Sequence, residues 1–172
     1  RPPSESLAAW KARLGQRNKA IRIGLVWSGN PRPPNRSITV ELMRPLLDIP
    51  GTEFYGLQKD VREGDARQLE SLPKVKMIGD QFADFGDTAA AISLLDLVIS
   101  VDTSVAHLAG ALGKPVWIIL PFAADWRWLT DRDDSPWYPT ARLFRHQDVH
   151  AQQETLRQVA IALAVFCRQP KK

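Results

Sequence analysis

The stretch from Leu97 to Trp117 reads as a strand, a polar turn, a helix and a second strand in immediate succession. Its first five residues are rich in β-branched side chains, which is typical of a strand buried on both faces. The run Asp102-Thr103-Ser104 then favours the start of a helix, and Gly113 stands where a helix over 105–112 would end in a left-handed cap. Such a unit requires a parallel sheet with crossover helices.

The rest of the chain repeats this alternation of strand and helix patterns. We expect strands at 21–27, 52–57, 75–78, 97–101, 116–120 and 141–144, and helices near 4–15, 40–47, 66–72, 88–95, 105–112 and 153–166. Asp87 is the expected cap of the helix over 88–95. The predicted fold class is α/β, a Rossmann-like doubly wound parallel sheet of about six strands. We expect residues 1–20 to form an N-terminal helix and linker, and residues 21–172 to form the Rossmann-like domain.

Composition narrows the class of protein. A chain of 172 residues with 44% hydrophobic and 24% charged residues predicts one globular domain. The net charge of +4 is scattered without a Lys/Arg-rich run, so no nucleic-acid partner is predicted. The apolar runs are too short for a transmembrane segment. The single Cys167 has no partner for an internal disulfide and fits a reducing compartment, so we expect a cytoplasmic protein.

Polar residues that suit a phosphate follow several of the predicted strands. Ligands collect at the carboxyl ends of parallel strands, so the loops there are the informative ones. Arg36 and Ser37 follow the first strand, Gln58 and Lys59 follow the second, and Asp102, Thr103, Ser104 and His107 follow the fourth. Free amides in the first turn of a helix bind anions, and a guanidinium can donate two parallel hydrogen bonds to phosphate oxygens.

The same residues also have ordinary explanations. Asp102 and Thr103 would cap a helix in any α/β protein, and Lys59 is equally a surface lysine. Other site types find little support. The first strand is followed neither by G-x-G-x-x-G nor by a Walker loop, which disfavours NAD binding and ATP hydrolysis. No metal site is predicted, because the three histidines are scattered. Asp125 and Asp133 are available carboxylates, but no catalytic residue is assigned.

The block DTSVAHLAGALGKP resembles the DT-x-x-x-H-L-A-x-A-L-G-x-P block of heptosyltransferase-like glycosyltransferases. The segments RIGLVWSGNP, NRSI, FYGLQKD and DWRWLTDRDDSPWYPTARLFR are similar to the C-terminal part of bacterial TPR-containing glycosyltransferases, which are more distantly related to O-GlcNAc transferases. Two departures occur in this chain. Ser104 stands where that family usually has glycine, and Pro33-Pro34 replaces a histidine common in the first loop.

The resemblance implies the donor-binding, C-terminal half of a GT-B architecture. It places the donor pyrophosphate on Asp102, Thr103, Ser104 and His107, with Arg36, Ser37 and Lys59 as further phosphate contacts, and it places the base or ribose near Gln58, Asp87 and Thr88. It implies a nucleotide-diphospho-sugar as substrate, no cofactor, no metal, and a missing N-terminal domain, with TPR repeats, as partners. We expect the chain alone to be a fragment without turnover. The alternatives are a non-catalytic nucleotide or nucleotide-sugar binding module and an inert scaffold. Base, sugar, acceptor, stereochemistry and oligomeric state stay open.

Overall fold

The computed structural model describes residues 1–30 and 36–168. Its sheet has the strand order β3-β2-β1-β4-β5-β6, and every neighbouring pair of strands is parallel. The strands are β1 (Ile21–Val26), β2 (Thr52–Gly56), β3 (Val75–Met77), β4 (Leu97–Val101), β5 (Val116–Leu120) and β6 (Ala141–Arg145). The predicted α/β fold with a doubly wound parallel sheet of six strands is therefore confirmed.

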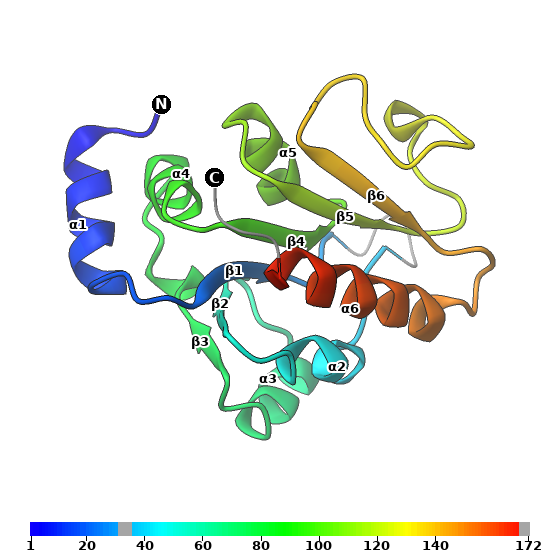
Figure 1. Cartoon of the computed structure of the whole chain (residues 1–172), viewed down its shortest axis with the longest axis horizontal. Coiled ribbons are helices and arrows are strands. Elements are labelled where there is room, and N and C mark those ends of the chain that lie inside the picture. Colours follow the sequence, from blue (N-terminus) through cyan, green and yellow to red (C-terminus); the bar gives the residue numbers. More distant parts are fainter. Residues whose placement is uncertain (31–35, 169–172) are drawn as a thin grey trace.

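Helices cover both faces of this sheet (Figure 1). One face carries α1 (Ser4–Leu14), α4 (Phe85–Ser93) and α5 (Ser104–Ala111), and the other carries α2 (Arg44–Leu47), α3 (Glu63–Glu70) and α6 (Gln152–Arg168). The central strands are buried along their whole length and send alternate side chains into two hydrophobic clusters, one under each helical layer. Within 1–30 and 36–168, no helix has the length and apolar character that crossing a membrane requires.

The first helix, α1, packs in the same layer as α4 and α5, on the face of the sheet where the turn from β4 into α5 begins. Trp10 on α1 is fully buried, and its ring centroid lies 5.0 Å from that of Phe82, just ahead of α4. Figure 1 shows α1 lying beside α4 at one end of the molecule. The helical part of residues 1–20 thus contributes to the hydrophobic core.

Two local predictions need correction. The segment 40–47 is helical as expected, but it is not one α-helix: a 3₁₀ turn, η1 (Val40–Met43), is followed by the single turn of α2. Pro45 lies in the first turn of α2, where its missing N–H costs nothing, and it favours a new helix start over a continuous helix. The cap of α4 is Asp84 and not Asp87: the Asp84 carboxylate accepts a hydrogen bond of 2.9 Å from the Asp87 amide.

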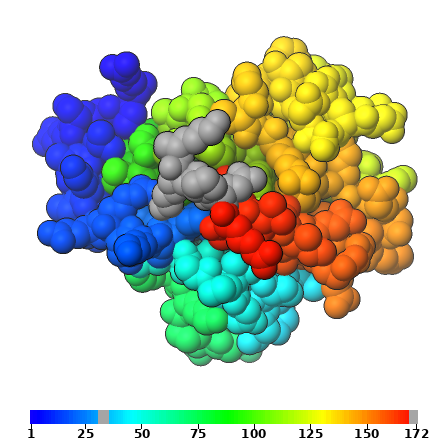
Figure 2. All heavy atoms as spheres, in the orientation of Figure 1, coloured from blue at the N-terminus to red at the C-terminus, as the bar shows by residue number. Residues whose placement is uncertain are grey.

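The long connection between β5 and β6 has no α-helix, and its one short helical turn is η3 (Trp126–Trp128). This rim segment, residues 121–140, projects at the edge of the molecule in Figure 2. The two tryptophans of the turn differ sharply, because Trp128 is fully buried while Trp126 is 74% exposed. Of these two side chains, only Trp128 is part of the hydrophobic core.

Candidate functional site

The chain changes direction across the sheet between β1 and β4. These strands are neighbours, but β1 leads to β2 on one side and β4 leads to β5 on the other. The loops that leave β1 and β4 therefore run in opposite directions, and a crevice forms between them at the carboxyl ends of the two strands. A cavity of about 770 Å³ lies there, bounded by the loops after β1 and β2, the segment entering α4 and the first turn of α5. We call it the switch-point cavity.

Most of the residues predicted to bind the donor reach this edge of the sheet. The switch-point cavity is lined by Arg36, Gln58, Lys59, Thr88, Thr103 and Ser104. A second cavity of about 620 Å³ shares Arg36, Thr103 and Ser104 with it and adds Asp102 and His107. Residues that are far apart in the sequence are thus brought to two adjoining cavities with a common wall. Pro33-Pro34 and Asn35 lie outside the described residues.

The common wall contains the N-terminus of α5, which has no side-chain cap among residues 1–30 and 36–168. Thr103 occupies the cap position, but its hydroxyl lies 3.0 Å from the Ser100 hydroxyl instead of turning back to the helix. The first amides of the helix therefore keep their hydrogen-bonding capacity, at the positive end of the helix dipole. Gly29 allows the first loop to approach closely, since a Cβ there would lie 3.2 Å from the Thr103 methyl group. The wall suits an anion.

Cationic side chains flank this helix end. Arg36 Nε is buried and has no hydrogen-bond partner in the described structure, and the Arg36 Nη1 contact to the Asp102 carbonyl is long, at 3.4 Å. Lys59 is exposed and makes no ion pair within residues 1–30 and 36–168. A buried guanidinium nitrogen without a partner carries a desolvation cost that an anionic ligand would offset.

Two of the predicted residues line neither cavity. The Ser37 hydroxyl accepts hydrogen bonds from the Gly29 amide (3.1 Å) and from Arg62 (2.7 Å), so it holds the first loop in shape. The Asp87 carboxylate accepts from the Ala83 amide at 3.1 Å, and this hydrogen bond holds the pKa of Asp87 below its ordinary value. Asp87 therefore orders the entry to α4, where the sequence suggested a ribose or base contact.

The remaining predicted contacts are also tied into the loops. Gln58 accepts a hydrogen bond from the Ser28 amide (3.1 Å), which joins the loops after β1 and β2. The Thr88 hydroxyl donates to the Asp84 carbonyl at 3.0 Å within α4. Apolar side chains complete the cavity on this side: Val26, Leu57, Phe82, Phe85 and Val105. A flat, weakly polar group such as a nucleobase fits such a lining.

His107 lies one turn into α5 and connects several groups. Its Nε2 is 3.5 Å from Asp102 Oδ1, and its Nδ1 is 3.0 Å from the Tyr138 hydroxyl. An ionised carboxylate only accepts hydrogen bonds, so this arrangement favours the tautomer with the proton on Nε2 and with Tyr138 donating to Nδ1. The imidazole also stacks on Trp128, with ring centroids 5.2 Å apart. Its orientation is thus fixed from three sides.

Sequence reasoning missed the aromatic residues of the second cavity. Trp126, Trp137 and Tyr138 line it together with Arg127, and all four come from the rim segment. One signal pointed to them: Gly110 sits inside α5, and a glycine within a helix often marks a close approach of another group. A Cβ on Gly110 would lie 2.5 Å from the Tyr138 ring, so this glycine makes room for that ring.

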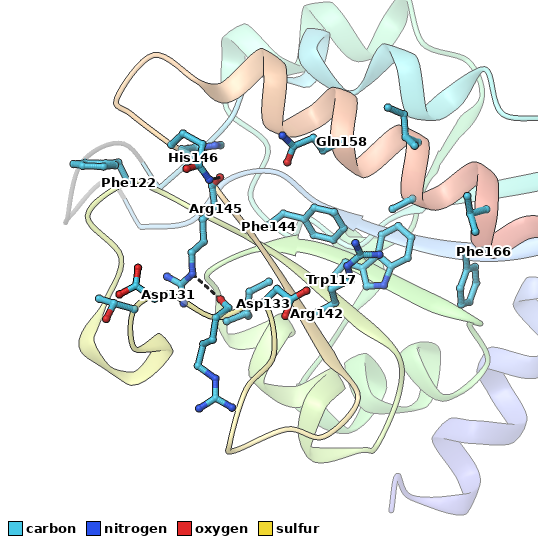
Figure 3. Close-up of a pocket in the computed structure, with 17 residues that line it drawn as sticks. Trp117, Phe122, Asp131, Asp133, Arg142, Phe144, Arg145, His146, Gln158 and Phe166 are labelled. Atoms are coloured by element: carbon cyan, nitrogen blue, oxygen red, sulfur yellow. Dashed lines mark hydrogen bonds between the residues drawn. The ribbon is translucent and has the colours of Figure 1, made fainter.

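A third cavity, larger than these two, lies elsewhere. A groove of about 1290 Å³, the α6 groove, runs between β6 and α6, and Figure 3 shows Trp117, Phe144 and Phe166 along it. Its cationic groups are already engaged. Arg145 donates to the carbonyls of Arg132 and Trp128. The Arg142 guanidinium lies 4.8 Å from the centre of the Phe144 ring.

Histidine in this groove also serves the fold. His146 is buried, its Nδ1 lies 2.8 Å from the Thr155 hydroxyl, and burial lowers its pKa below the ordinary value. His150, four residues on, is exposed. Within the described residues there is no group of three or more His, Cys, Asp or Glu side chains that could hold a metal ion.

Comparison with known proteins agrees with this architecture. Residues 62–121 match the model of glycosyltransferase family 9 (heptosyltransferase). Protein FlbA of Caulobacter vibrioides is 30% identical over 176 residues. Among solved structures, the ADP-heptose lipopolysaccharide heptosyltransferase II of E. coli superposes with a TM-score of 0.64 at 15% identity. A family 9 glycosyl transferase of Veillonella parvula gives 0.63 at 14% identity. The E. coli heptosyltransferase WaaC, solved with ADP, gives 0.60 at 16% identity.

The chain corresponds to part of each of these proteins. It is covered over 96% of its length by FlbA but spans only 28% of that protein. Of the two structures with the higher TM-scores it spans 53%, with 96% of its own length covered. For WaaC the shares are 46% and 87%. Residues 62–121 thus match the family 9 model, and the chain has the fold of about half of each heptosyltransferase structure on which it superposes.

Proposed function

We propose that this domain binds a nucleotide-diphospho-sugar and serves as the donor half of a GT-B glycosyltransferase that needs no metal ion. The observation that carries the proposal is the convergence of Arg36, Lys59 and the uncapped N-terminus of α5 on one cavity at the switch point of the sheet. The match of residues 62–121 to glycosyltransferase family 9 supports it. So does the presence of ADP in the structure of WaaC, which shares this fold.

The chemistry required of such a half is stabilisation of a leaving group. When the bond between the sugar and the diphosphate breaks, negative charge builds up on the departing phosphate oxygens. That charge would be stabilised by groups that are already in place: the amides at the start of α5, the Arg36 guanidinium and the Lys59 ammonium. The His107 Nε2–H, whose 3.5 Å contact with Asp102 Oδ1 is longer than an ordinary hydrogen bond, would turn to donate to the phosphate beside the wall, while Tyr138 continues to hold Nδ1.

The general base that activates the acceptor hydroxyl is not assigned to this chain. We propose that it belongs to the other half of the enzyme, as GT-B architecture implies, and that TPR repeats accompany that half. The chain alone should therefore bind a donor without transferring the sugar. Incubation of the chain with a radiolabelled nucleotide sugar and candidate acceptors should give no labelled product, and sugar transfer under these conditions would contradict the proposal.

Binding is the direct test. Isothermal titration with UDP, ADP, GDP and CDP should show one diphosphate bound in preference to the others, and Lys59→Ala and His107→Ala should each weaken it. Lys11→Ala and His150→Ala are matched controls, because both side chains are exposed and line neither cavity. No binding of any diphosphate, or equal weakening by the control variants, would contradict the proposed function.

A further inference from the structure

The second cavity at the edge of the sheet has a distinct character. It shares Arg36, Thr103 and Ser104 with the switch-point cavity, and beyond that wall it is bounded by Trp126, Trp137 and Tyr138 of the rim segment. We call it the aromatic chamber. A ligand that lay along the common wall and occupied both cavities would have one end among the apolar residues of the switch-point cavity. Its other end would lie among the aromatic rings of the chamber.

The two outer rings of the chamber are displayed to solvent. Trp126 is 74% exposed and Trp137 is 56% exposed, while Trp10, Trp27 and Trp128 are each 1% exposed or less. The Trp137 ring is nevertheless held in place, since its Nε1 donates a hydrogen bond of 2.8 Å to the Arg127 carbonyl. The Arg127 guanidinium, 3.2 Å from the Asp125 carboxylate, lies 5.7 Å from the centre of the Trp126 ring. Large apolar rings that remain exposed but positioned indicate a binding surface.

The floor of the chamber is tightly packed and hydrogen-bonded. Tyr138 packs against Gly110, where no side chain larger than hydrogen fits, and it hydrogen-bonds His107 at 3.0 Å. His107 in turn stacks on the buried Trp128. The floor therefore presents fixed hydrogen-bonding groups beneath aromatic walls, and Asp102 and Arg127 add a carboxylate and a guanidinium.

We propose that the aromatic chamber holds the sugar ring of the donor, with the Trp126 and Trp137 indoles packed against its C–H face. This inference rests on the proposed function. A pyranose offers apolar C–H groups on one face and hydroxyls around its edge, and the chamber offers aromatic faces with polar groups between them. The diphosphate then lies on the common wall and the nucleoside in the switch-point cavity, whose lining includes Leu57, Phe82 and Phe85.

The competing arrangement places the nucleobase against the tryptophans. Titration separates the two, because a base is present in the diphosphate and a sugar is not. UDP and UDP-glucose, ADP and ADP-glucose, and GDP and GDP-mannose should be titrated in pairs into the unmodified chain, the Trp126→Ala/Trp137→Ala variant and a Phe122→Ala control. Phe122 belongs to the same rim segment, is 61% exposed and lines the α6 groove, so it matches the tryptophans in exposure but not in place.

We expect the double variant to bind the best nucleotide sugar at least tenfold more weakly than the unmodified chain, while its affinity for the matching diphosphate stays within twofold. Phe122→Ala should change neither value. The inference is overturned if the variant weakens the diphosphate as much as the nucleotide sugar, which would place the base in the chamber. It is also overturned if both affinities survive, or if no nucleotide sugar binds where its diphosphate does. Failure of every diphosphate to bind the unmodified chain would instead overturn the proposed function and this inference with it.

Discussion

The carboxyl edge of the sheet and the α6 groove are both hollow and both contain arginine, yet they differ in what their polar groups are doing. The groove is larger, at about 1290 Å³. Its Arg145 donates hydrogen bonds to backbone carbonyls, and its His146 is hydrogen-bonded to Thr155. At the sheet edge, among residues 1–30 and 36–168, Arg36 Nε has no hydrogen-bond partner and the start of α5 has no side-chain cap. Buried hydrogen-bonding capacity that is still unused, and not volume, is therefore the reason for proposing the sheet edge as the binding site.

The sharpest separation of the two regions comes from tryptophan. Trp117 forms part of the groove wall and is 6% exposed, so Trp117→Ala should lower the free energy of unfolding by about 3–5 kcal/mol. Trp126→Ala, at an exposed position, should change it by less than about 0.5 kcal/mol. Urea unfolding measures both values. If folded Trp117→Ala lost its affinity for diphosphates, the two regions would form one coupled site and the comparison would break.

Arginine gives the next largest contrast, in binding. Arg36→Ala removes a guanidinium from the wall shared by both sheet-edge cavities, and loss of a charged hydrogen bond worth about 1.5–3 kcal/mol should weaken diphosphate binding by roughly 10- to 150-fold. Arg142→Ala removes one that lies over Phe144 in the groove and should leave the affinity unchanged. Titration calorimetry on the two variants compares them directly. Similar losses in both would mean that overall charge, and not the wall, governs binding.

A hydroxyl substitution sharpens the comparison further. Tyr138→Phe removes the group that meets His107 Nδ1, and a hydrogen bond worth about 0.5–1.5 kcal/mol predicts diphosphate binding weaker by roughly two- to tenfold. Thr155→Val removes the corresponding hydroxyl from His146 and should affect stability alone. Titration calorimetry and urea unfolding should be measured on both variants. If His107 served only to pack α5, Tyr138→Phe would lower the stability and leave the affinity for the diphosphate unchanged.

The smallest effect concerns pH and belongs to the groove. Burial holds the pKa of His146 below its ordinary value of 6.5. As the pH falls, His146 is therefore protonated in the unfolded chain at a higher pH than in the folded chain. This contribution to stability is complete above pH 6.5 and falls as the pH drops from there towards the folded pKa, by at most about 1.4 kcal/mol per pH unit. Urea midpoints at pH 7.5 and 5.5 should differ less in His146→Gln than in the unmodified chain. His150→Gln should keep the full difference, since His150 is exposed.

Sequence reasoning placed the strands and the loops that follow them, because buried parallel strands are continuous apolar runs and ligands gather at their carboxyl ends. It failed where tertiary packing or the exact backbone geometry, and not the local residue pattern, decides the outcome. Trp126 and Trp128 stand in the same short turn, but Trp128 is buried in the core and stacks on His107 of α5, while Trp126 is exposed. Asp84 and Asp87 are both acidic and both near the start of α4, and the backbone geometry there selects Asp84 as the cap. Tyr138 meets His107 from 31 residues away.

The uneven burial of tryptophan gives the protein a built-in optical reporter. Trp10, Trp27, Trp117 and Trp128 are at most 6% exposed, while the two indoles open to water, Trp126 and Trp137, both face the aromatic chamber. Indoles in water emit at longer wavelengths than indoles in an apolar interior, so the red edge of the intrinsic fluorescence comes from the chamber. Acrylamide, which quenches by collision, will reach the same two rings first. Occupancy of the chamber can therefore be followed in solution without attaching a dye, as a blue shift accompanied by protection from the quencher.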